Sequence, residues 1–285
     1  MKTQELKLYG WAKVLLIIIP YLFFVGIFQL IGGFLFEIDF SNPLSNKTSI
    51  QLLAISLFGL IGAFLTLWLV TKFIDRERLY QLGFQTKNRS IDFIIGIAIG
   101  LIIFSSGYLV LIHFNEIVFV KIDLNINEIL ISVLHFTIVA VVEETLFRGY
   151  VLKNFMESFN KYAALIISSG LFSSMHYFNP DFDLFSFFSL FLAGILFGIS
   201  YIYTKNLWFP IALHLSWNLF QALFGFNVSG SDTFSIIEFK ILESNFINGG
   251  SFGFEGSVLS IIAQVITITI IITYYRRKKI SWLIK

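Results

Sequence analysis

Long apolar runs constrain this chain more than any other feature. A helix that crosses the hydrocarbon core of a bilayer needs about 20 predominantly apolar residues. Eight such runs occur, at residues 11–36, 50–73, 91–114, 129–156, 162–178, 184–204, 207–226 and 257–275. They leave no room for a soluble domain, so we expect residues 1–285 to form one integral membrane domain. The predicted fold is an all-α membrane protein, a bundle of about eight transmembrane helices.

The composition supports a membrane protein. Hydrophobic residues make up 56% of the 285 positions and charged residues only 13%, whereas soluble domains carry about 25% charged residues. The absence of cysteine excludes disulfides, thiolate metal ligands and a cysteine nucleophile. The first run is too long for the hydrophobic region of a signal peptide and has no small-residue cleavage site. We therefore expect it to be retained as a span.

The basic residues predict an orientation. If eight spans begin with the N-terminus in the cytoplasm, all of the 20 Lys and Arg residues except Lys47, Lys121 and Lys240 fall on the cytoplasmic side. The opposite loops are acidic. The positive-inside rule favours this arrangement, so both termini are expected in the cytoplasm. A composition rich in Ile, Phe, Lys and Asn is typical of bacteria, which predicts a bacterial cytoplasmic membrane.

The fourth run places charged residues at membrane depth. Its segment "VVEETLFRGY" (141–150) contains Glu143, Glu144 and Arg148, and an ionised group costs about 2.5–3.5 kcal/mol at the centre of a membrane helix. Glu144 and Arg148 are four residues apart, so they share a helix face and are predicted to form an ion pair. Glu143 points about 100° away and is predicted to stay outside that pair.

Two further runs carry polar residues that can join this group. His176 lies near the end of the fifth run, and His214 and Asn218 lie one turn apart in the seventh. We expect all six side chains to line one intramembrane cavity. A carboxylate near imidazoles can act as a general base on water, and Asn and His can donate hydrogen bonds to an oxyanion. Glu143, His176 and His214 are also candidate ligands for a divalent metal such as Zn.

This site depends on the length of the fourth helix. With a rise of 1.5 Å per residue, Glu143 and His176 reach the same depth only if that helix continues to about residue 156. Other histidines, His113 and His135, are interpreted as hydrogen-bonded packing residues. The spacing of Gly194 and Gly198 in "GILFG" is explained by close helix packing.

Three motifs resemble those of a known family. "EETLFR" (143–148), "FSSMH" (172–176) and "HLSWN" (214–218) match, in order and on separate predicted helices, the EExxxR, FxxxH and HxxxN motifs of the CPBP intramembrane proteases, also called the CAAX prenyl protease type II or Abi family. "GGSFGFEGS" (249–257) resembles a Gly-Gly…Gly-x-Glu-Gly segment of many bacterial members. The resemblance covers about residues 75–275, with a catalytic core at 128–226.

The resemblance implies an eight-helix bundle with a conical cavity that opens toward the cytoplasm. It implies an intramembrane endopeptidase in which Glu143 activates water, and Glu144 and Arg148 orient Glu143 and balance its charge. His176 would assist Glu143 or bind a metal. His214 and Asn218 would stabilise the oxyanion.

The implied partners are the lipid bilayer and a membrane-embedded or lipidated peptide or protein substrate, with no nucleic acid. Eukaryotic members remove the last three residues of prenylated CAAX proteins. Bacteria generally lack such proteins, so peptide pheromones, bacteriocin precursors and signal-peptide remnants are candidate substrates.

Two other functions remain open at this stage. A non-catalytic membrane binding protein, acting in bacteriocin self-immunity or regulating a membrane signalling protein, would use the polar cluster as a binding pocket. An ion or proton transporter would also need buried carboxylates and histidines, but the sequence contains neither paired broken helices nor an inverted repeat.

Overall fold

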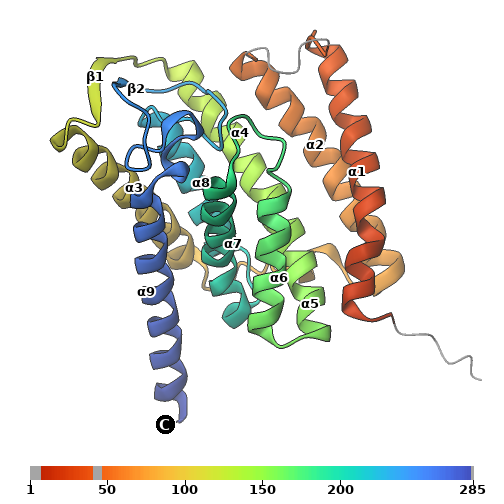
Figure 1. The fold of residues 1–285 in the computed structure, drawn as a ribbon. Coiled ribbons are helices and arrows are strands. Elements are labelled where there is room, and N and C mark those ends of the chain that lie inside the picture. Colours follow the sequence, from red (N-terminus) through yellow and green to blue (C-terminus); the bar gives the residue numbers. More distant parts are fainter. Residues whose placement is uncertain (1–7, 41–46, 284–285) are drawn as a thin grey trace, which may run out of the picture.

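The computed structural model describes residues 8–40 and 47–283, with side chains as far as residue 277. Within these residues the chain forms a helical bundle with one two-stranded ribbon (Figure 1). The helices are α1 (Gly10–Leu35), α2 (Ser49–Val70), α3 (Ser90–His113), α4 (Ile126–Glu144), α5 (Lys153–Ser158), α6 (Lys161–Ser174), α7 (Leu184–Thr204), α8 (Trp208–Leu223) and α9 (Val258–Leu283). The strands are β1 (Ile117–Ile122) and β2 (Ile237–Ile241). Short 3₁₀ turns occupy Leu79–Leu82, Gly250–Phe252 and Phe254–Gly256.

Two π-helical segments extend the α-helices. One, Thr71–Asp75, continues α2, and the other, Thr145–Leu152, joins α4 to α5. Residues Ile126–Ser158 therefore form a single helix of 33 residues. Counted in this way, the described residues contain eight helical rods, and the predicted bundle of about eight helices is confirmed.

Six of these rods are long and apolar enough to cross a membrane: Gly10–Leu35, Ser49–Asp75, Ser90–His113, Ile126–Ser158, Leu184–Thr204 and Val258–Arg277. The protein is therefore an integral membrane protein. Helices α6 and α8, with 14 and 16 residues, are shorter than the spans predicted at 162–178 and 207–226. Every residue of α8 from Pro210 to Asn218 is buried. Because protein rather than lipid surrounds this helix, it does not need the full length of a span.

Small residues bring the helices into close contact, as is usual where lipid supplies no hydrophobic driving force. Gly96 and Gly100 of α3 lie against α8, and the Ser216 hydroxyl donates a hydrogen bond to the Gly96 carbonyl at 2.9 Å. On α7, a Cβ added to Gly194 would lie 2.8 Å from the Cβ of Ser169, which belongs to α6. The predicted packing role of the "GILFG" spacing is confirmed.

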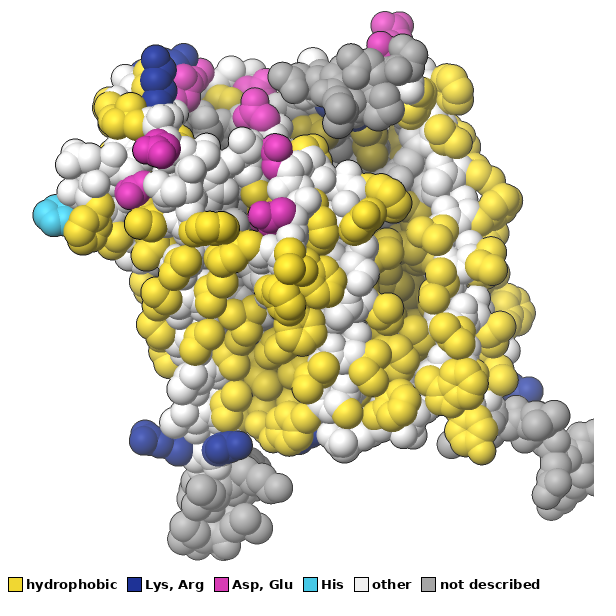
Figure 2. All heavy atoms as spheres, viewed as in Figure 1, with side chains coloured by type: hydrophobic (Ala, Val, Ile, Leu, Met, Phe, Trp, Pro, Cys, Tyr) yellow, Lys and Arg dark blue, Asp and Glu magenta, His cyan; other side chains and the backbone are white. Residues whose placement is uncertain are grey.

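The two ends of the bundle differ in charge, and Figure 2 shows a hydrophobic band between them. We call one end the basic end; it carries Lys13, Lys72, Arg76, Arg78, Lys87, Arg89, Lys153, Lys161, Lys205, Arg276 and Arg277. We call the other the loop end; it carries the β1–β2 ribbon and the acidic residues Glu37, Glu116, Asp123, Asp181, Asp183, Asp232, Glu238 and Glu243. Among the Lys and Arg side chains that the structure describes, three lie at the loop end: Lys47, Lys121 and Lys240.

Ion pairs tie the helices together at the basic end. Lys13 Nζ of α1 lies 2.9 Å from Asp75 Oδ1 and 3.1 Å from Glu157 Oε2. Lys153 pairs with Glu77, and the backbone N–H of Trp11 donates to Ser158 Oγ at 3.1 Å. Helices α1, α2 and α5 are therefore joined at this end. The predicted cytoplasmic position of Lys2 and Lys7 lies outside the described residues.

We expect Gly194→Ala to destabilise the bundle, because the new methyl group would overlap the backbone and Cβ of Ser169. Overpacking of this kind costs about 1–3 kcal/mol. Gly170→Ala is the matched control, since an added Cβ there meets nothing within 4 Å. Thermal unfolding in detergent should show a lower Tm for Gly194→Ala alone, and equal Tm values would contradict the packing assignment.

Candidate active site

The long helix from Ile126 to Ser158 positions the first motif. Glu143 and Glu144 are the last residues of α4, and the π-helical segment begins at Thr145. Single π-helical turns within α-helices occur frequently at functional sites. The helix continues past residue 156, so the condition for Glu143 and His176 to reach the same depth is met.

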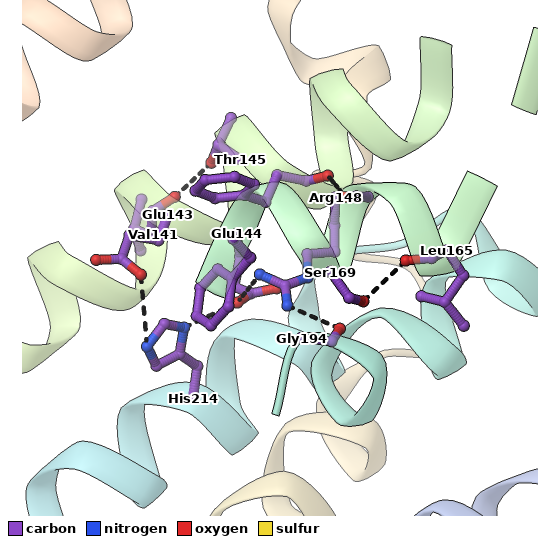
Figure 3. Close-up of polar contacts among 12 residues, drawn as sticks. Val141, Glu143, Glu144, Thr145, Arg148, Leu165, Ser169, Gly194 and His214 are labelled. Carbon is purple, nitrogen blue, oxygen red and sulfur yellow. Dashed lines mark hydrogen bonds and ion pairs between the residues drawn. The ribbon is translucent and has the colours of Figure 1, made fainter. Parts of the chain in front are cut away.

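Glu144 is the most enclosed member of the site. Its side chain has no solvent exposure, and its Oε1 accepts hydrogen bonds from Arg148 Nη1 at 2.9 Å and from His214 Nδ1 at 2.8 Å (Figure 3). The predicted Glu144–Arg148 ion pair is therefore confirmed. An ionised carboxylate only accepts hydrogen bonds, so the proton of a neutral His214 ring is on Nδ1. Its Nε2 is left free for other contacts.

Two aromatic rings fix the cation and the imidazole. The guanidinium carbon of Arg148 lies 4.6 Å from the ring centre of Phe172 and 5.5 Å from that of Phe197, distances typical of cation–π contact. Arg148 Nη2 also donates to the Gly194 carbonyl at 3.0 Å. The His214 ring stacks on Phe197 with centroids 4.6 Å apart. Phe172, Phe197 and the Gly194 carbonyl therefore fix the positions of Arg148 and His214.

Glu143 has a different environment. Its side chain is 28% exposed, and its Oε2 has no hydrogen-bond partner in the described part of the chain. This oxygen lies 3.9 Å from His214 Nε2. Both atoms are hydrogen-bond acceptors, so they make no direct hydrogen bond to each other. The prediction that Glu143 stays outside the ion pair is confirmed.

A cavity of about 700 Å³ brings the second and third motifs to Glu143. Its wall includes Glu143, His176, His214 and Asn218. His176 follows the end of α6 and uses Nδ1 to donate to the Phe172 carbonyl at 2.9 Å. Asn218 lies one turn after His214 on α8, and its amide makes no hydrogen bond to any described group.

The expectation that all six side chains line the cavity is wrong for Glu144 and Arg148. Both are buried behind the wall, where they hydrogen-bond to each other rather than border open space. The physical reason is that a charge pair removed from water is stable only when protein groups satisfy its donors and acceptors. Glu144 therefore contacts the cavity wall through His214, and Arg148 contacts it through Phe172 and Phe197.

The proposed metal ligands do not form a complete set. Among the described residues, no three His, Cys, Asp or Glu side chains lie close enough to hold a metal ion. His214 and His176 each commit Nδ1 to another acceptor, which leaves one nitrogen apiece. A catalytic zinc site needs three protein ligands around one point. The arrangement does not fit such a site, and the metal cofactor stays a prediction.

Sequence reasoning gave no role to Glu255, which also borders the cavity. Its buried carboxylate accepts hydrogen bonds from Trp217 Nε1 at 3.1 Å, from the backbone N–H of Ser229 at 3.0 Å and from Ser229 Oγ at 2.6 Å. It joins α8 to the loop before β2. The sequence signal for Glu255 is that it is the one charged residue within "GGSFGFEGS". In the same segment Gly253 has φ of 95°, and its backbone lies against the Asn227 carbonyl.

His135, which the sequence predicts to be a hydrogen-bonded packing residue, also lines the cavity. Its Nδ1 lies 3.0 Å from Ser56 Oγ, so the predicted hydrogen-bonded role is confirmed. Together with Gln29 these residues make a small polar patch on the α1–α2–α4 side of the cavity.

The family comparison agrees with this geometry. Residues 125–220 match the family described as "Type II CAAX prenyl endopeptidase Rce1-like". These residues, about a third of the chain, are similar to that family. The Rce1-like region runs from the N-terminal cap of α4 to α8 and contains all three motifs, so the resemblance inferred from them is confirmed. The family is one of CAAX-type intramembrane proteases, and the match supports a protease of this general class. Neither the curated proteins nor the solved structures that were compared match the chain.

We expect Arg148→Met to be strongly destabilising, because it leaves the Glu144 carboxylate buried without its counter-ion; breaking a buried pair costs about 3–5 kcal/mol. The double variant Glu144→Gln/Arg148→Met should recover part of this loss, since the remaining groups are neutral. Unfolding of the two single variants and the double variant in detergent measures the coupling. If the losses of stability in the two single variants simply add up in the double variant, Glu144 and Arg148 do not stabilise each other.

Glu255→Ala is expected to loosen the loop between α8 and α9. The donors on Trp217 and Ser229 would lose their partner, at about 1–3 kcal/mol for each unsatisfied buried group. Limited proteolysis should then cut residues 227–256 faster than in the wild type. Glu243→Ala, at an exposed position of the same loop, is the control, and equal cleavage of the two variants would argue against the anchoring role.

Proposed function

We propose that the protein is an intramembrane endopeptidase that hydrolyses a peptide bond of a membrane-embedded or lipidated substrate with water activated by Glu143. One observation carries the proposal. The unpartnered Oε2 of Glu143 faces His214 Nε2 across 3.9 Å at the cavity wall. The neighbouring carboxylate is neutralised by Arg148, so Glu143 is the carboxylate left for proton transfer.

The proposed reaction is general-base hydrolysis. Glu143 removes a proton from a water molecule beside Oε2 while the water oxygen attacks the carbonyl carbon of the substrate. The carbonyl π electrons move to oxygen and give a tetrahedral oxyanion. When the carbon–nitrogen bond breaks, Glu143 returns the proton to the leaving amine. A positioned base of this kind contributes about 10²–10⁴ in rate.

The other residues would orient His214 and stabilise the oxyanion. Glu144 holds Nδ1 of His214, and this fixes the ring so that Nε2 faces Glu143. In its protonated form His214 can donate from Nε2 to the oxyanion, and the free amide of Asn218 can do the same from the next turn of α8. His176, with Nδ1 held by Phe172, would use Nε2 to assist the water or the leaving amine.

The rest of the cavity suits an apolar peptide. Its wall includes Leu22, Val25, Leu52, Ile55, Val139 and Leu146. A mainly apolar wall with a few convergent polar groups is the usual form of a site that orients a ligand. This wall supports a substrate that enters as an apolar or lipid-modified segment.

Purified Glu143→Gln protein should cleave a membrane-tethered peptide at least about 100-fold more slowly than the wild type, because the amide cannot accept the proton. Glu128→Gln is a matched control on the same helix, outside the cavity wall, and should retain wild-type turnover. Thermal unfolding of both variants verifies that they fold.

If Glu143→Gln cleaves the peptide at the wild-type rate, the assignment of Glu143 as the catalytic base is wrong. The binding-protein alternative makes a different prediction: cells with Glu143→Gln or His214→Ala would keep the wild-type phenotype. Charge movement in proteoliposomes would instead indicate a transporter.

A further inference from the structure

The cavity extends from the middle of the bundle toward the loop end. Its wall uses residues 21–29 of α1 and residues 52–60 of α2, which adjoin at the loop end because the two helices are antiparallel. It also uses Asn179 and residues 228–233 from loops at that end. The first turns of α1, the last turns of α2 and all of α5 are absent from the wall among the residues that the structure describes.

The basic end is closed by direct contact between helices. A Cβ added to Gly10 of α1 would lie 1.9 Å from the Asn154 carbonyl oxygen of α5, so the two backbones touch. Lys13, with a side chain 10% exposed, pairs with Asp75 and Glu157 beside this contact. A peptide cannot pass between α1 and α5 without breaking these ion pairs.

Fixed polar groups form the rim at the loop end. The Asn179 amide donates to the Ser229 carbonyl at 3.1 Å, and Glu255 holds the Ser229 backbone N–H and hydroxyl. Ser231 and Thr233 continue this rim, and the Ser231 residue is exposed. Ser231 is therefore a wall residue of the cavity that is also exposed at the loop end.

We propose that the cavity opens on the non-cytoplasmic side of the membrane, and that the substrate is a peptide segment presented at that surface rather than a tail made in the cytoplasm. The bias of Lys and Arg toward the basic end places that end in the cytoplasm. The cavity extends from the middle of the bundle toward the opposite end. Identifying the occupant as a substrate rests on the proposed function; the direction of opening does not.

The cavity and the basic residues disagree about the membrane side on which the site opens. The resemblance implies a cavity open to the cytoplasm, and the charge bias implies cytoplasmic termini. Both cannot hold for this chain, because its basic residues lie at one end and its cavity extends toward the other. Charge placement is a property of this sequence itself, so we give it precedence over the resemblance.

The absence of cysteine makes a direct test available. Ser231→Cys places a thiol on the rim, and Lys87→Cys places one at an exposed position of the basic end. Sealed right-side-out membrane vesicles would be treated with a membrane-impermeant maleimide before and after permeabilisation. Rim labelling in sealed vesicles, with Lys87→Cys labelled only after permeabilisation, is the expected result. The reverse pattern, or equal labelling of both positions in sealed vesicles, overturns the proposal.

A second arm separates access from activity. A membrane-tethered peptide added to sealed right-side-out vesicles should be cleaved at least about tenfold faster than the same peptide added to inside-out vesicles. Faster cleavage in inside-out vesicles overturns the proposed opening. Absence of cleavage in both preparations and after solubilisation would count against the endopeptidase function, while the labelling result would still decide the direction of opening.

Discussion

One buried oxygen organises this site: Oε1 of Glu144 accepts hydrogen bonds from Arg148 and from His214. An ionised carboxylate without partners is too costly to bury, so these two donors must stay in place for the fold to be stable. The same bonds set the tautomer and the direction of the His214 ring. Stability and chemistry therefore depend on one interaction, and His214 links it to Glu143.

The surrounding architecture serves that interaction. Phe172 and Phe197 enclose the Arg148 guanidinium, and the Gly194 carbonyl of α7 accepts a hydrogen bond from Arg148. The π-helical segment lies directly behind the two glutamates. On the far wall, Glu255 performs a comparable structural task for the loop that forms the rim. The buried carboxylates of Glu144 and Glu255 thus fix the structure around the cavity. The Glu143 carboxylate faces the cavity, and its Oε2 has no hydrogen-bond partner among the described residues.

The two ends of the bundle differ in how they enclose the cavity. Ion pairs and backbone contact close the basic end, and hydrogen-bonded loops shape the other. In this chain the helices that carry the motifs are enclosed by protein, whereas orientation is set by residues at the two ends, so the two properties are physically separable.

The sequence by itself determined the membrane class, the number of helices, the ion pair between Glu144 and Arg148 and the separate position of Glu143. These follow from length, hydropathy and helical period, which are local properties. It also supplied the three motifs of the Rce1-like region. Only the tertiary structure decided that Glu144 and Arg148 lie behind the cavity wall, that His214 connects the two glutamates and that Glu255 anchors the rim. It also placed the cavity opposite the basic end. Those facts depend on how separate helices are rotated and packed, which the spacing along one chain does not specify.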